Sequence, residues 1–319
     1  MPLACLLLAA AFPAAAAGGE GDPPAGVREG YSHPALVIPY AHRKPAIDGV
    51  VDDEEWRGAA SVNALQTVRQ ELSARQSRFW LAWDEGHLYV AMRSPLRPGE
   101  RVIQSHRRRD RNVLAVLDDA YEIWIDAGAR SPDGMRCHVQ YLGNFAGARY
   151  DALYFPQIGS RHVDFAAGWK PVNRITPDGG AWEMEVAIPP GSVHHAAPWA
   201  DGEVLRMLLA RDFKRPWSQA SLEGAKSFQT QEVYSQVTLS WDAPAVHVLD
   251  VGDPRARTFG LRLGGLGRRD ETLRWAFLTD GDAGREGVLE LKAGQYAEAA
   301  PGLDLDRPGK GAMRVRVQA

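Results

Sequence analysis

Residues 46–56 read AIDGVVDDEEW, in which an Asp-Gly pair follows two apolar residues and an acidic run leads to a tryptophan. Asp48 and Gly49 predict a turn in which the aspartate side chain bonds nearby backbone. The acidic run predicts one short turn of helix at most, and we assign Trp56 to the core. The acidic side chains offer oxygen ligands for calcium, but their spacing is not that of an EF-hand loop, so a solvated turn is the stronger interpretation.

Two later segments predict strands that fit beside this one. Residues 79–92 alternate in side-chain character on both sides of an Asp-Glu-Gly-His turn, which predicts a β-hairpin. Residues 118–126, DDAYEIWID, predict a carboxylate-rich strand with Glu122 and Trp124 on one face and apolar residues on the other. The same alternation predicts further strands at 182–188, 204–211 and 233–241.

Many short strands separated by Gly, Pro, Asp and Asn, without a long helical period, predict an all-β protein with an antiparallel β-sandwich. We place this sandwich at residues 36–242. After Trp-Asp-Ala-Pro at 241–244 the strand pattern restarts and continues to the end of the chain. We therefore predict a second, smaller immunoglobulin-like β domain at 243–319, which ends within a strand pattern and so leaves truncation open.

The chain has 319 residues, 45% hydrophobic and 24% charged, as expected for a soluble globular protein with room for two domains. Its net charge of -3 argues against a nucleic-acid partner. Residues 1–17 contain a short apolar run that closes with an Ala-x-Ala pattern, which predicts a cleaved signal peptide. A Gly- and Pro-rich linker follows at 18–35, and no other segment is apolar for long enough to span a membrane.

Only Cys137 remains after the predicted cleavage, so the mature chain has no internal disulfide. We interpret Cys137 as a small buried hydrophobic residue. Export without disulfides predicts a secreted or periplasmic bacterial protein whose core is large enough to be stable by itself.

The carboxylates do not predict an enzyme. Glycoside hydrolysis needs two carboxyl groups about 5–10 Å apart across the scissile bond. Glu122 and Asp126 lie on the same face of one predicted strand, about 13 Å apart at strand rise, so we predict no catalytic residues. The basic run at 107–111 is either a solvated loop or a contact for an acidic glycan.

Sugar binding fits the residues better. A sugar presents an apolar C–H face and hydroxyls, so its site needs an aromatic platform beside acceptors and amides. Glu122 and Trp124 offer both, although Trp124 could equally pack the sheet. Gln140 and Asn144 share a face of the next predicted strand, where they either meet hydroxyls or satisfy loop backbone. Trp217, in a predicted loop, is a further platform, with Trp169 and Trp199 as the next candidates.

Taken in this order, and followed by Trp-Glu-Met-Glu-Val-Ala-Ile-Pro at 182–189, these segments resemble the family 9 carbohydrate-binding modules over roughly residues 36–241. The resemblance implies a sandwich that binds carbohydrate without catalysis. Sugar-binding members clamp a terminal sugar between two tryptophans, and the matching positions here hold Val116 and Phe228. The family's glutamate and asparagine match Glu122 and Asn144, while a neighbouring arginine is replaced by Leu142.

The predicted ligand-contacting residues are therefore Glu122, Trp124, Asn144 and Phe228, with Gln140 and Trp217 as outer candidates. The predicted ligand is a polysaccharide or oligosaccharide of a glycan-degrading system. We predict no cofactor and assign no metal site, and the resemblance leaves open whether a structural calcium ion is bound.

Two alternatives remain. The first is a structural or interaction module that kept the sandwich and lost the sugar site, which Val116 and Leu142 favour. The second is the N-terminal part of a longer glycoside hydrolase, so that a catalytic glycosidase follows as a domain or acts as a partner.

Overall fold

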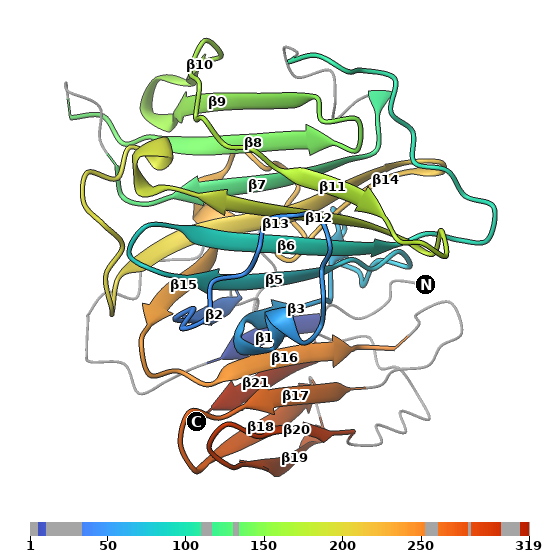
Figure 1. The fold of residues 1–319 in the computed structure, drawn as a ribbon, viewed down its shortest axis with the longest axis vertical. Helices are drawn as coiled ribbons and strands as arrows, with labels where there is room; N and C mark the ends of the chain where they lie inside the picture. Colours follow the sequence, from blue (N-terminus) through green and yellow to red (C-terminus); the bar gives the residue numbers. More distant parts are fainter. Residues whose placement is uncertain are drawn as a thin grey trace.

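The computed structural model describes residues 6–10, 34–109, 117–129, 134–252, 261–279, 282–300 and 313–318. Strands dominate these ranges, and the helical elements among them are single 3-10 turns, so the predicted all-β class is confirmed. Two sheets run along the length of the molecule, one behind the other (Figure 1). No helix in the described ranges has the length and apolar character of a membrane span.

The larger sheet contains the carboxylate-rich strand at its middle. Its strands, in spatial order, are β10 (Ser160–His162), β9 (Arg149–Phe155), β8 (His138–Asn144), β7 (Ala120–Asp126), β13 (Val204–Lys214), β15 (Ser235–Ser240), β2 (Ala35–Pro39), β1 (Leu6–Ala10), β21 (Met313–Gln318), β18 (Glu271–Thr279) and β19 (Asp282–Leu291). β14 (Trp217–Ser221) pairs with β13 and with the short β4 (Gln66–Thr67).

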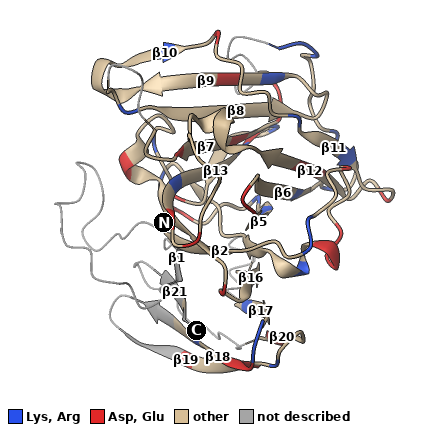
Figure 2. Cartoon of the chain, turned by 60° about the vertical axis from the view of Figure 1, so that its left-hand side comes forward, with Lys and Arg blue, Asp and Glu red and all other residues tan. Residues whose placement is uncertain are grey.

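The smaller sheet contains the predicted hairpin. Its strands, in spatial order, are β11 (Val172–Ile175), β12 (Ala181–Ile188), β6 (Leu88–Pro95), β5 (Arg78–Trp83), β3 (Ala60–Val62), β16 (Ala245–Asp250), β17 (Arg262–Leu266) and β20 (Tyr296–Ala299). The 3-10 turns are η1 (Glu55–Gly58), η2 (Pro156–Ile158), η3 (Pro190–Val193) and η4 (Gln231–Val233). Figure 2 shows acidic and basic residues interspersed over the molecule.

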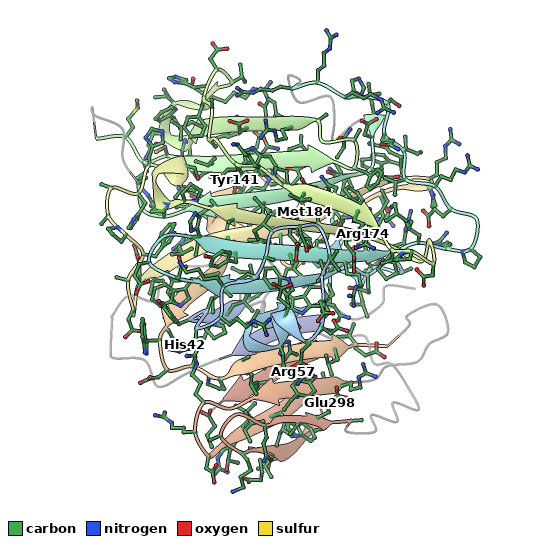
Figure 3. All side chains as sticks on the ribbon, viewed as in Figure 1. His42, Arg57, Tyr141, Arg174, Met184 and Glu298 are labelled. Carbon is green, nitrogen blue, oxygen red and sulfur yellow. The ribbon has the colours of Figure 1, made fainter. Side chains whose placement is uncertain are left out.

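The main core lies between the two sheets and follows the alternation of the strands. Tyr121, Ile123 and Ile125 of β7 belong to it, as does the apolar face of β12 that includes Met184. Figure 3 labels Met184 and Tyr141, which belong to facing sheets and to this one core. Burying a large apolar side chain contributes roughly 1.5–3 kcal/mol relative to exposure. Cys137 is free and 1% exposed, as predicted for a small buried residue.

The predicted hairpin is formed by β5 and β6, which pair from Arg78 with Arg93 to Trp83 with Leu88. Asp84 stabilises its turn, because Oδ1 accepts hydrogen bonds from the backbone N–H groups of Gly86 and His87 at 2.8 Å each. An aspartate at the first position of a turn uses its side chain in this way when the local backbone donors have no other partner.

The motif at 46–56 is attached to β12 by one carboxylate. Asp48 makes the predicted turn, with Oδ1 accepting from the backbone N–H of Val50 at 2.9 Å, and Gly49 has a φ of +87° that favours glycine. Glu185, fully buried on β12, accepts from the backbone N–H groups of Asp48 at 3.0 Å and Gly49 at 2.8 Å. It also accepts from the indole N–H of Trp56 at 2.7 Å, so one side chain holds both ends of the motif.

The acidic run of the motif leads into a short helical turn, as predicted. Asp52 Oδ1 accepts from the backbone N–H groups of Glu54 at 2.8 Å and Glu55 at 3.1 Å, at the start of η1. Trp56 is 1% exposed, which confirms its assignment to a core. It anchors this turn through a small core between η1 and the outer face of the smaller sheet.

Strands after residue 243 continue both sheets. β16 lies parallel to β3, with His247 opposite Ser61, and β21 lies parallel to β1. The division at 242/243 and the immunoglobulin-like character of the second part stay predictions. The strand β1 falls within the predicted signal peptide, whereas residues 1–5 and 11–33, with most of the linker, lie outside the described residues.

Replacing Glu185 with alanine should strongly destabilise the protein. The change leaves two buried N–H donors and one partly buried donor without their acceptor, which should lower the free energy of unfolding by roughly 3 kcal/mol or more. Trp56→Phe removes a single donor and should cost about 1–2 kcal/mol. Denaturant unfolding followed by fluorescence measures both, with the exposed Glu232→Ala as the control. A Glu185→Ala protein as stable as this control would refute the attachment.

Candidate functional site

A group of polar and aromatic side chains covers the middle of the larger sheet, on the face opposite the main core. We call it the Glu122 cluster, and it comprises Glu122 and Trp124 of β7, Gln140 of β8, Tyr154 of β9 and Asp212 of β13. Even-numbered residues of β7 reach this face because odd-numbered ones point into the core. The segment at 222–234, which joins β14 to β15, packs over it through Ala225 and Tyr234.

Hydrogen bonds connect the cluster across three neighbouring strands. Glu122 Oε2 accepts from the indole N–H of Trp124 at 2.7 Å and from the side-chain amide of Gln140 at 2.7 Å. Gln140 Oε1 in turn accepts from the hydroxyl of Tyr154 at 3.1 Å. The prediction that Glu122, Trp124 and Gln140 share one surface is therefore consistent with the strand order, since β7 pairs with β8 and β8 with β9.

Asp212 lies against Glu122 from the neighbouring strand, a contact that the sequence pattern did not indicate. β13 pairs with β7 so that Asp212 is opposite Ala120 and Ala210 opposite Glu122. Burial, and next the repulsion from Asp212, raise the pKa of Glu122 well above its ordinary value. Burial likewise raises the pKa of Asp212 to about 6. Two buried carboxyl groups in contact share protons, because ionising both would place like charges side by side where burial weakens their solvation.

Trp124 and Asn144 do not present the open surfaces that we expected of them. Trp124 is 1% exposed, so its ring packs within the cluster and its indole serves Glu122. Asn144 is fully buried and donates to Asp118 Oδ2 at 2.7 Å and to the backbone carbonyl of His106 at 2.8 Å. Its carbonyl oxygen accepts from the backbone N–H of Ala148 at 2.9 Å, so this amide satisfies loop groups, the alternative that its position left open.

Phe228 and Trp217 keep accessible rings. Phe228 is half-buried and packs against the apolar residues of the sheet face that carries the Glu122 cluster, a set that includes Trp124 and Tyr154. Trp217 is 61% exposed at the start of β14, with the Lys214 ammonium 5.9 Å from its ring, so it lies on a strand and not in a loop. The two other tryptophans considered as platforms, Trp169 and Trp199, are each 1% exposed and belong to the main core.

The positions that distinguish this chain from the family pattern are only partly described. Leu142 is buried among the apolar residues of the same face and lies opposite Glu122 on the neighbouring strand, whereas Val116 lies outside the described residues. Of the basic run, Arg109 forms an ion pair with Asp151 at 3.3 Å, and residues 110–111 lie outside the described ranges. Within the described ranges no group of three or more His, Cys, Asp or Glu side chains is arranged to hold a metal ion. The calcium ion that the resemblance left open stays untested.

Comparison with known proteins supports the fold alone. No protein-family model matches the sequence, and no curated protein is similar to it. A family 9 carbohydrate-binding module from Caldicellulosiruptor kristjanssonii matches in two complexes. With cellotriose the TM-score is 0.44 at 13% identity over 66% of this chain and 95% of that chain. With glucose the TM-score is 0.43 at 14% identity over 65% of this chain and 97% of that chain.

A candidate carbohydrate-binding protein from Bacteroides uniformis ATCC 8492 matches with a TM-score of 0.51 and 12% identity. The match covers 66% of this chain and 100% of that chain. The two proteins share a fold. The predicted sandwich is therefore confirmed as a fold, and what it binds has to be argued from the residues of this chain.

A third buried carboxyl group lies beside the cluster. Glu223 is 1% exposed in the segment that covers the sheet, and its Oε1 accepts from the hydroxyl of Ser235 at 2.5 Å. Burial raises the pKa of Glu223 to about 8. Between pH 4.5 and 8 the folded protein therefore holds a proton that the unfolded chain has released.

This difference predicts a pH-dependent stability. A raised carboxyl pKa contributes stability that is fully present below the unfolded value and is lost as the pH rises through the folded value. The free energy of unfolding should fall as the pH rises from 4.5 to 8, by about 1.4 kcal/mol per pH unit for each extra proton held. Thermal unfolding over this range measures the slope, which should be shallower in Glu223→Gln. An unchanged slope would contradict the assignment.

Proposed function

We propose that this protein is an exported, non-catalytic carbohydrate-binding protein of a glycan-degrading system, secreted or periplasmic in a bacterium. The observation that carries the proposal is the Glu122 cluster, in which carboxyl, amide, phenol and aromatic groups meet on a fold shared with a candidate carbohydrate-binding protein. Burying two adjacent carboxyl groups costs stability, and such perturbed groups concentrate at functional sites.

The chemistry of the cluster suits a polysaccharide or oligosaccharide. Glu122 and Gln140 are each only 3% exposed and are hydrogen-bonded to each other and, through Glu122, to Trp124, so in this proposal they order the sheet surface beside the ligand instead of presenting open side chains to it. Phe228 provides the accessible apolar ring beside them, on which the C–H face of a sugar packs. In this proposal Asn144 orders the neighbouring loops, and Trp217 forms an outer contact.

The Glu122–Asp212 pair raises the question of a hydrolase, which the geometry disfavours. The carboxyl groups of a glycosidase stand at least about 5 Å apart so that a sugar bond fits between them. Glu122 and Asp212 instead interact directly, at 3% and 0% exposure. We therefore propose that any glycosidase activity comes from a further domain or a partner protein.

Calorimetric titration of the full chain with neutral and acidic oligosaccharides tests the proposal. Binding should weaken about tenfold or more in Phe228→Ala, because the sugar loses its apolar contact, and in Glu122→Gln, because an acceptor becomes a donor. Val204→Ala is the matched control, since Val204 is 54% exposed on β13 outside the cluster.

Two results would contradict the proposal. Binding that both variants retain would exclude the cluster as the sugar site. A folded protein that binds no glycan would favour the interaction module, which keeps the sandwich without a sugar site, and would direct the search to protein partners.

A further inference from the structure

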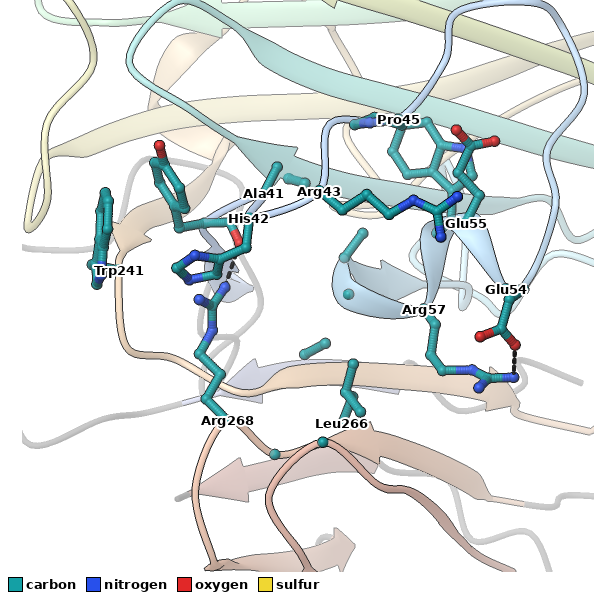
Figure 4. Close-up of a pocket in the computed structure, with 18 of the residues that line it drawn as sticks. Ala41, His42, Arg43, Pro45, Glu54, Glu55, Arg57, Trp241, Leu266 and Arg268 are labelled. Atoms are coloured by element: carbon teal, nitrogen blue, oxygen red, sulfur yellow. Dashed lines mark hydrogen bonds and ion pairs between the residues drawn. The ribbon is translucent and has the colours of Figure 1, made fainter.

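A pocket of about 650 Å³ lies between the motif at 46–56 and the strands that follow residue 241. Its volume is within the range of about 300–1,000 Å³ that small-molecule sites occupy. Residues from six parts of the chain line it, within 40–45, 54–59, 241–245 and 266–268 and at Ala82 and Gly294. Figure 4 shows the labelled side chains around the pocket, which is separate from the Glu122 cluster.

One end of the pocket is an aromatic wall. The ring centroids of Tyr40 and Trp241 are 3.9 Å apart. The His42 ring meets both edge-on, with centroid distances of 4.9 Å to Tyr40 and 5.4 Å to Trp241. Tyr40 is held in place because its hydroxyl donates to Glu85 at 2.8 Å. Trp241 is 41% exposed, unlike the tryptophans that pack the cores, so it has ring surface available for a ligand.

Small residues create the space. The pocket is lined by Ala41, Gly58, Ala59, Ala82, Ala245 and Gly267, where larger side chains would fill it. A Cβ atom added at Gly58 would meet no atom within 4 Å. The space is therefore a property of these side chains, and a larger side chain at Gly58 would reduce it without backbone strain.

Three arginines surround the same space. Arg57 forms an ion pair with Glu54, and Arg268 donates to the backbone carbonyls of Tyr40 and Ala243 and forms no ion pair with any carboxylate in the described ranges. Arg43 also lines the pocket, and it forms no hydrogen bond or ion pair with any described residue. Figure 4 shows Arg43 extending along the edge of the pocket toward Glu55.

His42 adds no positive charge to this group at neutral pH. Burial, followed by repulsion from Arg268, lowers the pKa of His42 below its ordinary value. The ring is therefore neutral and offers one donor and one acceptor. The carboxylates of Glu54 and Glu55 at the opposite end are already occupied, by Arg57 and by the backbone N–H of Ala46.

We propose that this pocket binds a short acidic oligosaccharide, in which the carboxylate of one uronic sugar pairs with Arg43 and the C–H face of another sugar packs on the Tyr40–His42–Trp241 wall. A guanidinium group binds carboxylate through two parallel hydrogen bonds, and a sugar ring suits an aromatic wall beside polar groups. The inference rests on the proposed function, because it names an acidic glycan as the ligand. It places that ligand at a second site, not on the Glu122 cluster.

Calorimetric titration of the full chain with trigalacturonic acid, and with galactotriose as the neutral match, tests the inference. The acidic trisaccharide should bind, and its affinity should fall about tenfold or more in Arg43→Gln, Trp241→Ala and Gly58→Leu. Arg69→Gln, which removes an exposed arginine outside the pocket, is the matched control and should bind normally. Thermal unfolding confirms that each variant is folded.

The other outcomes separate this inference from the proposed function. If Phe228→Ala abolishes binding and the three pocket variants do not, the pocket is overturned and the Glu122 cluster stands. If galactotriose binds as tightly as trigalacturonic acid and Arg43→Gln has no effect, the acidic class is overturned. If the folded protein binds neither these nor any other glycan, the proposed function fails and this inference fails with it.

Discussion

The buried carboxylate of Glu185 is the contact on which the placement of residues 46–56 against the smaller sheet depends. It accepts hydrogen bonds from two backbone N–H groups of the turn at Asp48 and Gly49 and from the indole of Trp56. Burial raises its pKa to about 7, even though three donors favour the charged form. A buried carboxyl group is costly unless its acceptor sites are filled, so this contact both requires and specifies the conformation of residues 46–56.

The position of one wall of the pocket depends on that contact. Trp56 holds η1 against the outer face of the smaller sheet, and η1 carries Glu54, Arg57 and Gly58 to the rim of the pocket. Trp241 and Arg268 form the opposite wall. Trp241 directly follows β15, and Arg268 follows β17. The pocket therefore forms only when the motif at 46–56 and the strands after residue 241 pack against each other. This holds wherever the domain boundary lies.

The larger sheet uses its two faces differently. The odd-numbered residues of β7 fill the main core, and its even-numbered residues form the Glu122 cluster. Alternation along the strand was enough to predict that Glu122 and Trp124 share a face, and adjacency of β7 and β8 brought Gln140 to them. The burial of Trp124 was not predictable, because a period of two does not show what covers a face. Asp212 was missed because the predicted strand ended at residue 211, one position short.

The sequence by itself determined the all-β class, the hairpin at 79–92, the Asp-Gly turn, the core assignments of Trp56 and Cys137, and the faces of β7 and β12. These features depend on side-chain periodicity and on turn residues, which act over a few positions along the chain. Only the tertiary structure decided that Glu185 reaches Gly49, 136 residues away, that Asp212 contacts Glu122, and that Arg43 and Trp241 line one pocket. Such contacts depend on strand order and on how the sheets pack, and many strand orders satisfy the same local pattern.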